Sequence, residues 1–212
     1  MAWVDRSVRD FIEAVAAATP TPGGGSIAAL AAASAAALLQ MYVLRSAQSS
    51  RVAPDWRTRF PEVAGRIAGW KLRALALVDE DVRTFEAVLE ARRQSQTTEA
   101  ERAARAEAIR TATLRAAGVP LEVAELCLQA LQACQELVPH GLASMRSDVQ
   151  TAYYIARAGL AAALANVAIN LEVLEPAAVP EDLRARYEAA CQALAVAPPD
   201  LRGYERAGHE PR

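Results

Sequence analysis

The sequence has few of the residues that most often carry metal sites and nucleophilic catalysis. It contains two histidines, His140 and His209, so a histidine-rich zinc site or a Ser-His-Asp triad is not expected. Its three cysteines are odd in number and include no CxxC pair, which argues against a disulfide framework and fits a reducing cytoplasm. Any chemistry therefore depends on carboxylates, amides, hydroxyls and backbone groups.

The charge and composition of the chain exclude further classes of protein. The formal net charge of −2 argues against a broad electrostatic surface for nucleic acid. Hydrophobic residues make up 53% of the 212 residues, which excludes a disordered chain, although aromatics reach only 5%. The N-terminal segment MAWVDRSVRD lacks a basic region followed by an apolar one, so we expect no signal peptide.

Apolar residues recur at helical spacing along the chain, and no segment alternates as a strand does. The pattern predicts one all-α domain over 1–212, an antiparallel helical bundle with long central Ala-rich helices, a core over about 7–195 and a C-terminal tail over 196–212. Ser7, Thr98 with Glu101, and Ser147 are the expected helix caps. We expect helices over about 7–18, 25–49, 98–117, 121–138, 147–174 and 180–195, with a break or kink at Gly118–Pro120, and a long third helix that starts around Asp55 or Pro61 and ends at Arg93.

The second predicted helix has no charged residue from Ile27 to Leu39. A membrane span needs about 20 strongly apolar residues, whereas this run is mostly alanine and contains Ser34. A helix that is apolar on all sides is otherwise a buried central helix, which is the interpretation we favour.

Asp81 interrupts an otherwise apolar face of the third predicted helix. Leu77 lies four residues before it and Phe85 four residues after it, so its carboxylate falls on the face expected to be buried. A buried carboxylate without a partner is costly, so its pKa rises or a partner is supplied. Two interpretations stay open: an arginine from a neighbouring helix pairs with Asp81, or the carboxylate serves a reaction in a cleft.

Two amides lie in a long uncharged stretch between Arg157 and Glu172. Asn166 and Asn170 are four residues apart, so they share one helix face. Asparagine is a mediocre helix former, so the pair needs a reason. These side chains either hydrogen-bond across the bundle or line a ligand slot. Asp148, near the start of the same helix, either caps the helix or belongs to the same site.

The stretch TPTPGGGS, residues 19–26, separates the first two predicted helices. It is not a P-loop, because no Gly-Lys-Ser/Thr follows it and no strand precedes it. Its glycines open a buried helix, where unpaired N–H groups at the positive end of the helix dipole suit anionic or oxyanionic groups. The missing side chains also let a flat ligand lie against the backbone.

Four segments of the chain form a specific combination when they are read in order. They are FIEAVAAATPTPGGGSIAALAAASAAALLQM, LVDEDVRTFEAVLEA, AAGVPLEVAELC and SDVQTAYYIARAGLAAALANVAINL. Together they resemble the cyclodeaminase/cyclohydrolase family over roughly residues 7–195. That family includes the cyclodeaminase domain of formiminotransferase-cyclodeaminase and stand-alone bacterial methenyltetrahydrofolate cyclohydrolases.

The resemblance implies an all-helical fold, a homodimer or higher oligomer, and tetrahydrofolate chemistry in a cleft shaped by the glycine-rich loop. It implies catalytic acids at Asp81 and Asp148, and no metal or organic cofactor besides the folate substrate. The positions implied to bind substrate are Pro22, Gly23, Gly24, Gly25, Ser26, Asn166 and Asn170.

Two segments depart from the family pattern. The family has a lysine-rich stretch of the type G-K-K-K where this chain reads LRSAQSSRVAPDW, which leaves Arg45 or Arg51 to meet the glutamate carboxylates of folate. The family also has an asparagine-containing loop where this chain reads HGLASMR. These departures keep open a helical binding or interaction module that has lost catalysis. A general anion-binding domain is a further alternative.

The resemblance leaves two reactions at the same ring. A cyclohydrolase, a hydrolase, converts 5,10-methenyltetrahydrofolate into 10-formyltetrahydrofolate, whereas a cyclodeaminase, a lyase, converts 5-formiminotetrahydrofolate into 5,10-methenyltetrahydrofolate and ammonia. Each requires an acid–base group and stabilisation of an amidinium-like cation, which a buried Asp81 can provide. The absence of a fused formiminotransferase domain favours the cyclohydrolase. We expect a cytoplasmic enzyme with a small-molecule folate substrate and no nucleic-acid or membrane partner.

Overall fold

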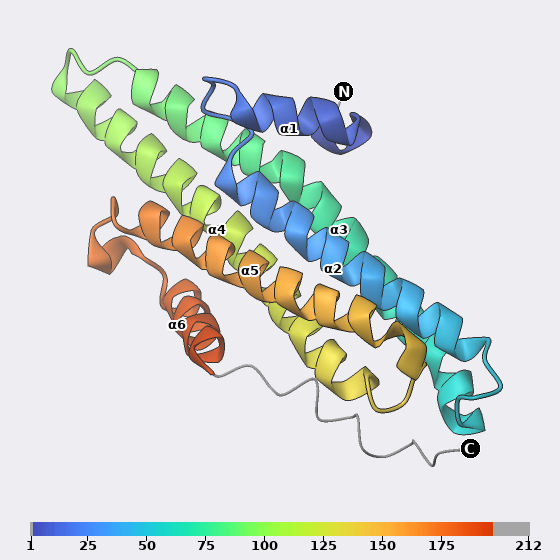
Figure 1. The fold of residues 1–212 in the computed structure, drawn as a ribbon. Helices are drawn as coiled ribbons and strands as arrows, with labels where there is room; N and C mark the ends of the chain where they lie inside the picture. Colours follow the sequence, from blue (N-terminus) through green and yellow to red (C-terminus); the bar gives the residue numbers. More distant parts are fainter. Residues whose placement is uncertain (1, 197–212) are drawn as a thin grey trace.

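The computed structural model describes residues 2–196, and every regular element in that range is a helix (Figure 1). The all-α prediction is therefore confirmed. The predicted tail lies outside the described residues from position 197 onward, as does His209. The α-helices are α1 (Val8–Ala16), α2 (Gly24–Ala47), α3 (Pro54–Arg93), α4 (Glu99–Leu137), α5 (Arg146–Leu171) and α6 (Glu181–Ala195), and 3₁₀ turns cover Trp3–Asp5, Ala143–Met145 and Pro176–Ala178.

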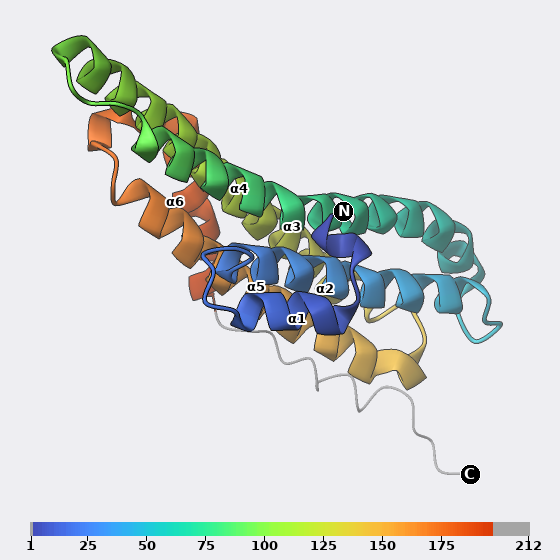
Figure 2. The same ribbon diagram turned by 90° about the horizontal axis from the view of Figure 1, so that it is seen from above.

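The four long helices α2 to α5 form a bundle (Figure 1). Short loops join them, so successive helices run antiparallel. The central helix is α2, because it packs against α3, α4 and α5. On the outside, α1 buries Phe11 near Leu30 of α2 and Val78 of α3, and α6 packs against α4 and α5 (Figure 2).

Small side chains allow the central helices to approach closely. Ala28, Ala29 and Ala32 of α2 are buried, as expected for a central helix. At Gly159 of α5, an added Cβ would lie 3.0 Å from Cys127 Sγ of α4 and 3.2 Å from Ala31 Cβ of α2. A larger residue at this crossing would push α5 away from both neighbours.

Two segments are long and apolar enough to cross a membrane by length and composition alone. They are Gly24–Ala47 and Ala143–Leu171, and 50% and 44% of their most apolar windows are buried inside the bundle. Core helices of bundles have the same composition, because they are covered on several faces.

The helix ends follow local signals in most places. Ser7 Oγ accepts the N–H of Asp10 at 3.1 Å, and Thr98 with Glu101 forms the expected capping box at the start of α4. The predicted cap at Ser147 is wrong, because α5 already begins at Arg146. The 3₁₀ turn Ala143–Met145 continues directly into α5, so the helix starts one residue earlier than predicted.

Helix α4 is continuous through Gly118–Pro120, so the separate helix predicted to begin at Leu121 is wrong. Pro120 has no N–H to give the carbonyl of Ala116, four residues earlier. The Nδ2 group of Asn170 on α5 donates to that carbonyl at 3.3 Å. A side chain of the neighbouring helix thus replaces the missing backbone bond, and α4 stays helical across the proline.

Candidate functional site

Asp81 of α3 lies against the first turn of α2. Ser26, which is fully buried, donates from Oγ to Asp81 Oδ2 at 2.7 Å. A Cβ added to Gly25 would lie 2.6 Å from Asp81 Cγ and 2.9 Å from Oδ2, so only glycine fits there without moving the carboxylate. The end of the glycine-rich loop and the acid therefore form one unit.

The surroundings raise the pKa of the Asp81 carboxyl above its ordinary value. Burial is the main cause, because it removes water from the charged form, and hydrogen bonds from the side chain and backbone N–H of Ser26 act in the opposite direction. Within residues 2–196 no arginine forms an ion pair with Asp81, so the first of the two interpretations above is not what the structure contains. A carboxyl with a raised pKa accepts and returns a proton closer to neutral pH.

Asn166 and Asn170 lie one turn apart on α5, beside the start of α2. Asn166 Nδ2 donates to the carbonyl of Ala162 at 2.8 Å, and Asn170 Nδ2 donates to the carbonyl of Asn166 at 2.8 Å as well as to α4. A Cβ added to Gly24 would lie 3.5 Å from Asn166 Nδ2, so the loop backbone lies over this amide. Asn170 thus bonds across the bundle, as one interpretation expected, and Asn166 lies beside the glycine-rich loop.

Exposed apolar side chains lie on the parts of α3 and α5 that extend past the start of α2 (Figure 1). Phe85, on the same face as Asp81, is 38% exposed, and Ile169 and Val173 near the end of α5 are 59% and 58% exposed. These side chains lie beyond the point where α2 covers its neighbours.

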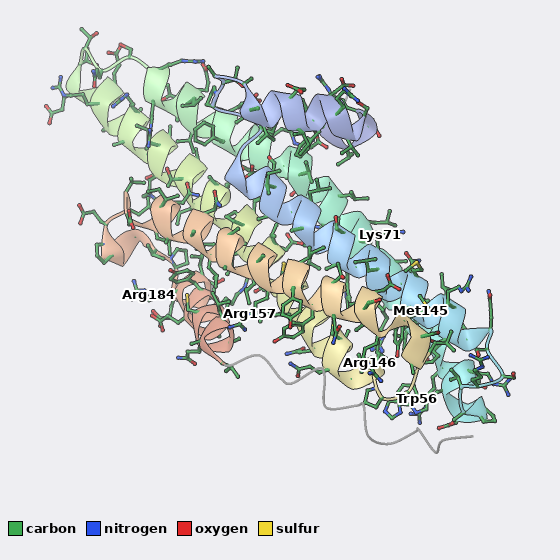
Figure 3. The ribbon with its side chains drawn as sticks, viewed as in Figure 1. Trp56, Lys71, Met145, Arg146, Arg157 and Arg184 are labelled. Carbon is green, nitrogen blue, oxygen red and sulfur yellow. The ribbon has the colours of Figure 1, made fainter. Side chains whose placement is uncertain are left out.

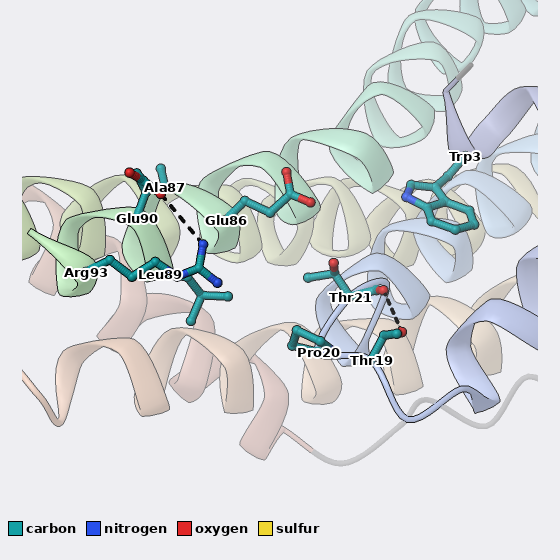
Figure 4. A pocket seen from close by; sticks show the side chains of 9 residues that line it. All are labelled: Trp3, Thr19, Pro20, Thr21, Glu86, Ala87, Leu89, Glu90 and Arg93. Carbon is teal, nitrogen blue, oxygen red and sulfur yellow. Dashed lines mark hydrogen bonds and ion pairs between the residues drawn. The ribbon is translucent and has the colours of Figure 1, made fainter.

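A cavity of about 730 Å³ adjoins the glycine-rich loop (Figure 4). It opens between this loop and the part of α3 that follows Asp81, and its volume lies in the usual range for ligand pockets. The backbone N–H of Trp3 donates to Asp79 Oδ1 at 2.6 Å, which fixes the indole end of the cavity. The lining residues are Trp3, Thr19, Pro20, Thr21, Glu86, Ala87, Leu89, Glu90 and Arg93.

Asp148 lies in the first turn of α5, far from Asn166 on the same helix. The 18 positions between them correspond to about 27 Å at the usual rise per residue. Met145 and Arg146, just before Asp148, lie near Trp56 at the other end of the bundle (Figure 3). Within one chain, the structure does not bring Asp148 to Asp81.

The candidate cations for folate carboxylates also lie away from Asp81. Arg45 is in the last turn of α2, about 31 Å from Gly24 along the helix axis. Lys71 of α3, which the sequence patterns do not single out, shares a depression of about 400 Å³ with Arg45 and donates to Gln40 Oε1 at 2.7 Å. Arg51 is exposed in the turn that follows α2. None of these side chains reaches Asp81 of the same chain.

The described side chains offer the site carboxylate, amide and hydroxyl groups. Among residues 2–196, no group of three or more His, Cys, Asp or Glu side chains is placed to hold a metal ion. Burial raises the pKa of the Cys127 and Cys134 thiols to about 12, as expected for cysteines that serve as small apolar core residues.

Comparison with known proteins decides the family. A sequence model of the family described as "Formiminotransferase-cyclodeaminase" matches residues 7–189, most of the chain. The chain belongs to this family. The resemblance noted in the sequence is thereby confirmed, and the loop that carries it is the one that contacts Asp81.

Two curated relatives of this formiminotransferase-cyclodeaminase family member differ in length. Methenyltetrahydrofolate cyclohydrolase of Methylorubrum extorquens is 29% identical over 178 residues, which cover 84% of this chain and 85% of that protein. Formimidoyltransferase-cyclodeaminase of Mus musculus is 34% identical over 172 residues, which cover 80% of this chain and 31% of that protein. The chain thus spans nearly all of the first relative and about a third of the second.

A solved structure supports the fold of this family member. Formiminotetrahydrofolate cyclodeaminase from Thermotoga maritima superposes with a TM-score of 0.72 at 23% identity, covering 90% of this chain and 94% of that one. The helical bundle is therefore the fold of a known relative, and the single-bundle architecture predicted from the sequence agrees with it.

Proposed function

We propose that this protein hydrolyses 5,10-methenyltetrahydrofolate to 10-formyltetrahydrofolate. The observation that carries the proposal is the partly buried Asp81 carboxyl, which accepts a hydrogen bond from Ser26, lies against Gly25 and has a raised pKa. The relative named methenyltetrahydrofolate cyclohydrolase, which this chain matches over most of both lengths, supports the choice of reaction.

In this reaction Asp81 acts as the acid–base group. The oxygen of a water molecule bonds to the methenyl carbon while the Asp81 carboxylate takes one of the water protons. The bond from this carbon to N5 then breaks as Asp81 returns that proton to N5, while the new hydroxyl group loses its remaining proton to solvent and becomes the carbonyl of the formyl group on N10. The negative charge of Asp81 also stabilises the amidinium-like cation of the substrate, because partial burial reduces the screening of this charge by water.

The remaining residues of the cleft hold the substrate in the proposal. Gly23 and Gly24 keep their backbone open to the ring, whereas Pro22, Gly25 and Ser26 are buried, and Asn166 and Asn170 hydrogen-bond the polar edge of the ring. The cavity beside the loop takes the part of folate that leads away from the ring. Arg93, which pairs with Glu90 at 3.6 Å in that cavity, offers a cation to the glutamate carboxylates.

Cyclodeamination of 5-formiminotetrahydrofolate is the second candidate. The mammalian relatives and the Thermotoga maritima protein carry that activity in their names. In this reaction N10 bonds to the formimino carbon and gives up its proton to Asp81, which passes it to the formimino nitrogen; the bond from the carbon to this nitrogen then breaks and ammonia leaves. The same carboxylate thus serves both reactions, and the substrate decides between them.

We also propose a homodimer that acts in the cytoplasm without a metal or organic cofactor, and with no nucleic-acid or membrane partner. Asp148 supports the dimer, because its carboxylate approaches an Asp81 cleft only if that cleft belongs to a second copy. Met41, Leu44 and Leu72 supply exposed apolar side chains for such a contact. Light scattering of the purified protein tests the oligomeric state, and a monomer at micromolar concentration contradicts the dimer.

One assay tests the reaction. The ultraviolet absorbance of methenyltetrahydrofolate is followed with purified protein, and a parallel sample contains formiminotetrahydrofolate. Enzyme-dependent decay in the first sample supports the hydrolysis, and a rise of the same band in the second supports the deamination. Neither change, together with no folate binding, would indicate a binding or interaction module, and binding of phosphate compounds without folate preference would indicate a general anion-binding domain.

A further inference from the structure

Helix α2 carries one stripe of side chains that the bundle leaves uncovered. Most positions over 25–43 are buried. The half-buried or exposed positions in this range are Ile27, Leu30, Ala31, Ser34, Ala37, Leu38, Gln40 and Met41. Gln40 turns toward α3, where it accepts a hydrogen bond from Lys71. The other residues form one helix face, because they follow one another at spacings of three and four.

The residue types along this stripe mirror one another on the two sides of Ser34. An alanine lies three residues away on each side, a leucine lies four residues away, and Ile27 and Met41 lie seven residues away. When a helix packs antiparallel on its own copy across a two-fold axis, each residue meets the residue at the mirrored position of the partner. The stripe therefore fits a second α2, with Met41 against Ile27 of the partner subunit and leucine against leucine.

Helix α5 widens this surface, because it lies beside α2 (Figure 1). A Cβ added to Gly159 would lie 3.2 Å from Ala31 Cβ, so the exposed Ala158 lies beside the middle of the stripe. No charged residue occurs over 24–44 or over 158–171. The exposed residues over 158–171 are Ala158, Ala161, Ala165 and Ile169. Together with the α2 stripe they form what we call the α2–α5 face, which can lie on its own copy without bringing like charges together.

The dimensions of the α2–α5 face match one side of a stable interface. Helix α2 has 24 residues and is therefore about 36 Å long, and two helices packed side by side are about 20 Å wide. The face thus covers about 700 Å² in each copy, close to the usual value of about 800 Å² for one partner. Ser34 Oγ donates to the carbonyl of Leu30 at 2.8 Å, so its burial between two copies leaves no polar group unpaired.

A lipid surface fits the α2–α5 face less well than a second copy does. Helices that lie on membranes insert bulky side chains such as Trp, Phe and Leu, and they carry Lys and Arg beside them. The centre of this face consists of alanines and Ser34, and α2 has no cation before Arg45 in its last turn. Small side chains favour close helix packing instead, because they let two backbones approach one another.

We infer that the α2–α5 face is the surface on which a second copy of this chain packs, with α2 antiparallel to its copy and the two-fold axis at Ser34. The inference rests on the proposed homodimer and adds the surface and the register of the contact. The antiparallel arrangement reverses one bundle relative to the other. It therefore carries the end that holds the partner subunit's Asp148 toward the end of this chain that holds Asp81.

Two cysteine substitutions test the register. With Ile27→Cys alone or Met41→Cys alone, the two introduced thiols of a dimer lie about 21 Å apart along the helices, too far for a disulfide. In the double variant, position 27 of each subunit meets position 41 of the other. Oxidation should then give at least tenfold more covalent dimer on denaturing gels than either single variant gives. All three proteins carry Cys191→Ser, because Cys191 is half-buried whereas Cys127 and Cys134 are buried.

Charged substitutions at the axis test the symmetry. Ser34→Glu and Ser34→Arg each place two like charges at the two-fold axis, so each protein alone should be monomeric at micromolar concentration in sedimentation velocity. An equimolar mixture should regain the dimer mass, because unlike charges then meet. Ala158→Glu should also raise the dissociation constant of the dimer at least tenfold. Ala76→Glu is its matched control, since Ala76 is exposed on α3 outside the α2–α5 face, and it should dimerise as the wild type does.

The outcomes separate this inference from the proposed homodimer and from the proposed reaction. A monomeric wild-type protein contradicts both the dimer and this inference, and a monomer that floats with vesicles of phosphatidylcholine and phosphatidylglycerol assigns the face to lipid. A wild-type dimer whose double cysteine variant cross-links no better than the single variants overturns this inference alone. So does an Ala158→Glu or Ser34→Glu protein that is folded, by circular dichroism, and stays dimeric. The methenyltetrahydrofolate assay measures the proposed hydrolysis separately in each case.

Discussion

Replacing Gly25 by alanine tests whether the contact between the loop and Asp81 matters for the chemistry. The new methyl carbon would lie 2.6 Å from Asp81 Cγ, whereas carbon atoms in contact are usually about 3.5–4.0 Å apart. The overlap of about 1 Å is relieved most easily when the carboxylate turns away, because it is the end of a short side chain. The 2.7 Å hydrogen bond from Ser26 is then lost.

The magnitudes predict a folded protein with poor catalysis. Losing a hydrogen bond to a charged group costs about 1.5–3 kcal/mol. Alanine inside a helix returns about 0.5–1 kcal/mol relative to glycine, so the net loss of unfolding free energy is about 0.5–2.5 kcal/mol. A misplacement of about 1 Å at a reacting group lowers the rate about 100-fold. We therefore expect Gly25→Ala to retain its helical content and to lose about two orders of magnitude in kcat.

Gly69→Ala is the matched control, because it makes the same change inside α3 where an added Cβ meets nothing within 4 Å. It should raise the unfolding free energy by about 0.5–1 kcal/mol and leave kcat unchanged. The measurements are urea unfolding followed by circular dichroism and initial rates from methenyltetrahydrofolate absorbance. Wild-type kcat in Gly25→Ala would refute the placement of Asp81 by the loop as a requirement for catalysis.

Three further changes have defined outcomes. Asp81→Asn should lower kcat at least tenfold. It should also raise Tm, because burial destabilises the folded protein only when Asp81 is ionised. This increase in Tm should be close to zero at pH values up to the ordinary pKa of aspartate and should reach a plateau at pH values above the raised pKa of Asp81. Asn170→Leu should cost about 1 kcal/mol of unfolding free energy in the wild type and close to none in Pro120→Ala, where an N–H again meets the Ala116 carbonyl. Thr113→Val should raise the unfolding free energy by about 1 kcal/mol, since the Thr113 hydroxyl is buried without a hydrogen-bond partner among the described residues.

Each of these changes has a control or a contradicting result. Asp79→Asn removes a neighbouring charge outside the cleft and should leave kcat unchanged. A Tm of Asp81→Asn that tracks the wild type at every pH would show that burial does not perturb Asp81. If Asn170→Leu lowers the unfolding free energy equally in the wild type and in Pro120→Ala, Asn170 does not replace the backbone hydrogen bond that Pro120 lacks. Thr111→Val, on the exposed side of α4, should change the unfolding free energy by less than about 0.5 kcal/mol.

Local signals explain why most helices could be predicted. Ser7 and Thr98 satisfy free N–H groups of their own first turns, so their effect needs no other part of the fold. The apolar periodicity before Asp81 likewise predicted the buried side of α3, since the spacing of a helix fixes which side chains share a face. The prediction fails one turn after Asp81, where Phe85 is 38% exposed. The elevated pKa of Asp81 follows from that burial.

Pro120 shows where local signals stop. A proline removes one backbone bond, and from the sequence alone a break is the expected result. The break is avoided because Asn170, 50 positions later in the chain, lies at the right height on α5 to supply the missing donor. The register between two helices decided this, and the sequence pattern of one helix contains no information about it.

The sequence by itself determined the helical fold, the family, the glycine-rich loop and an acid on a buried face, because helix spacing and motif order are properties of neighbouring residues. Tertiary structure decided which of these residues meet. It placed Ser26 and Gly25 on Asp81 and kept Asp148 about 27 Å away from Asn166 along α5. The reason is geometric: α2 starts partway along α3 and α5, so the contacts at its first turn depend on helix lengths and relative height.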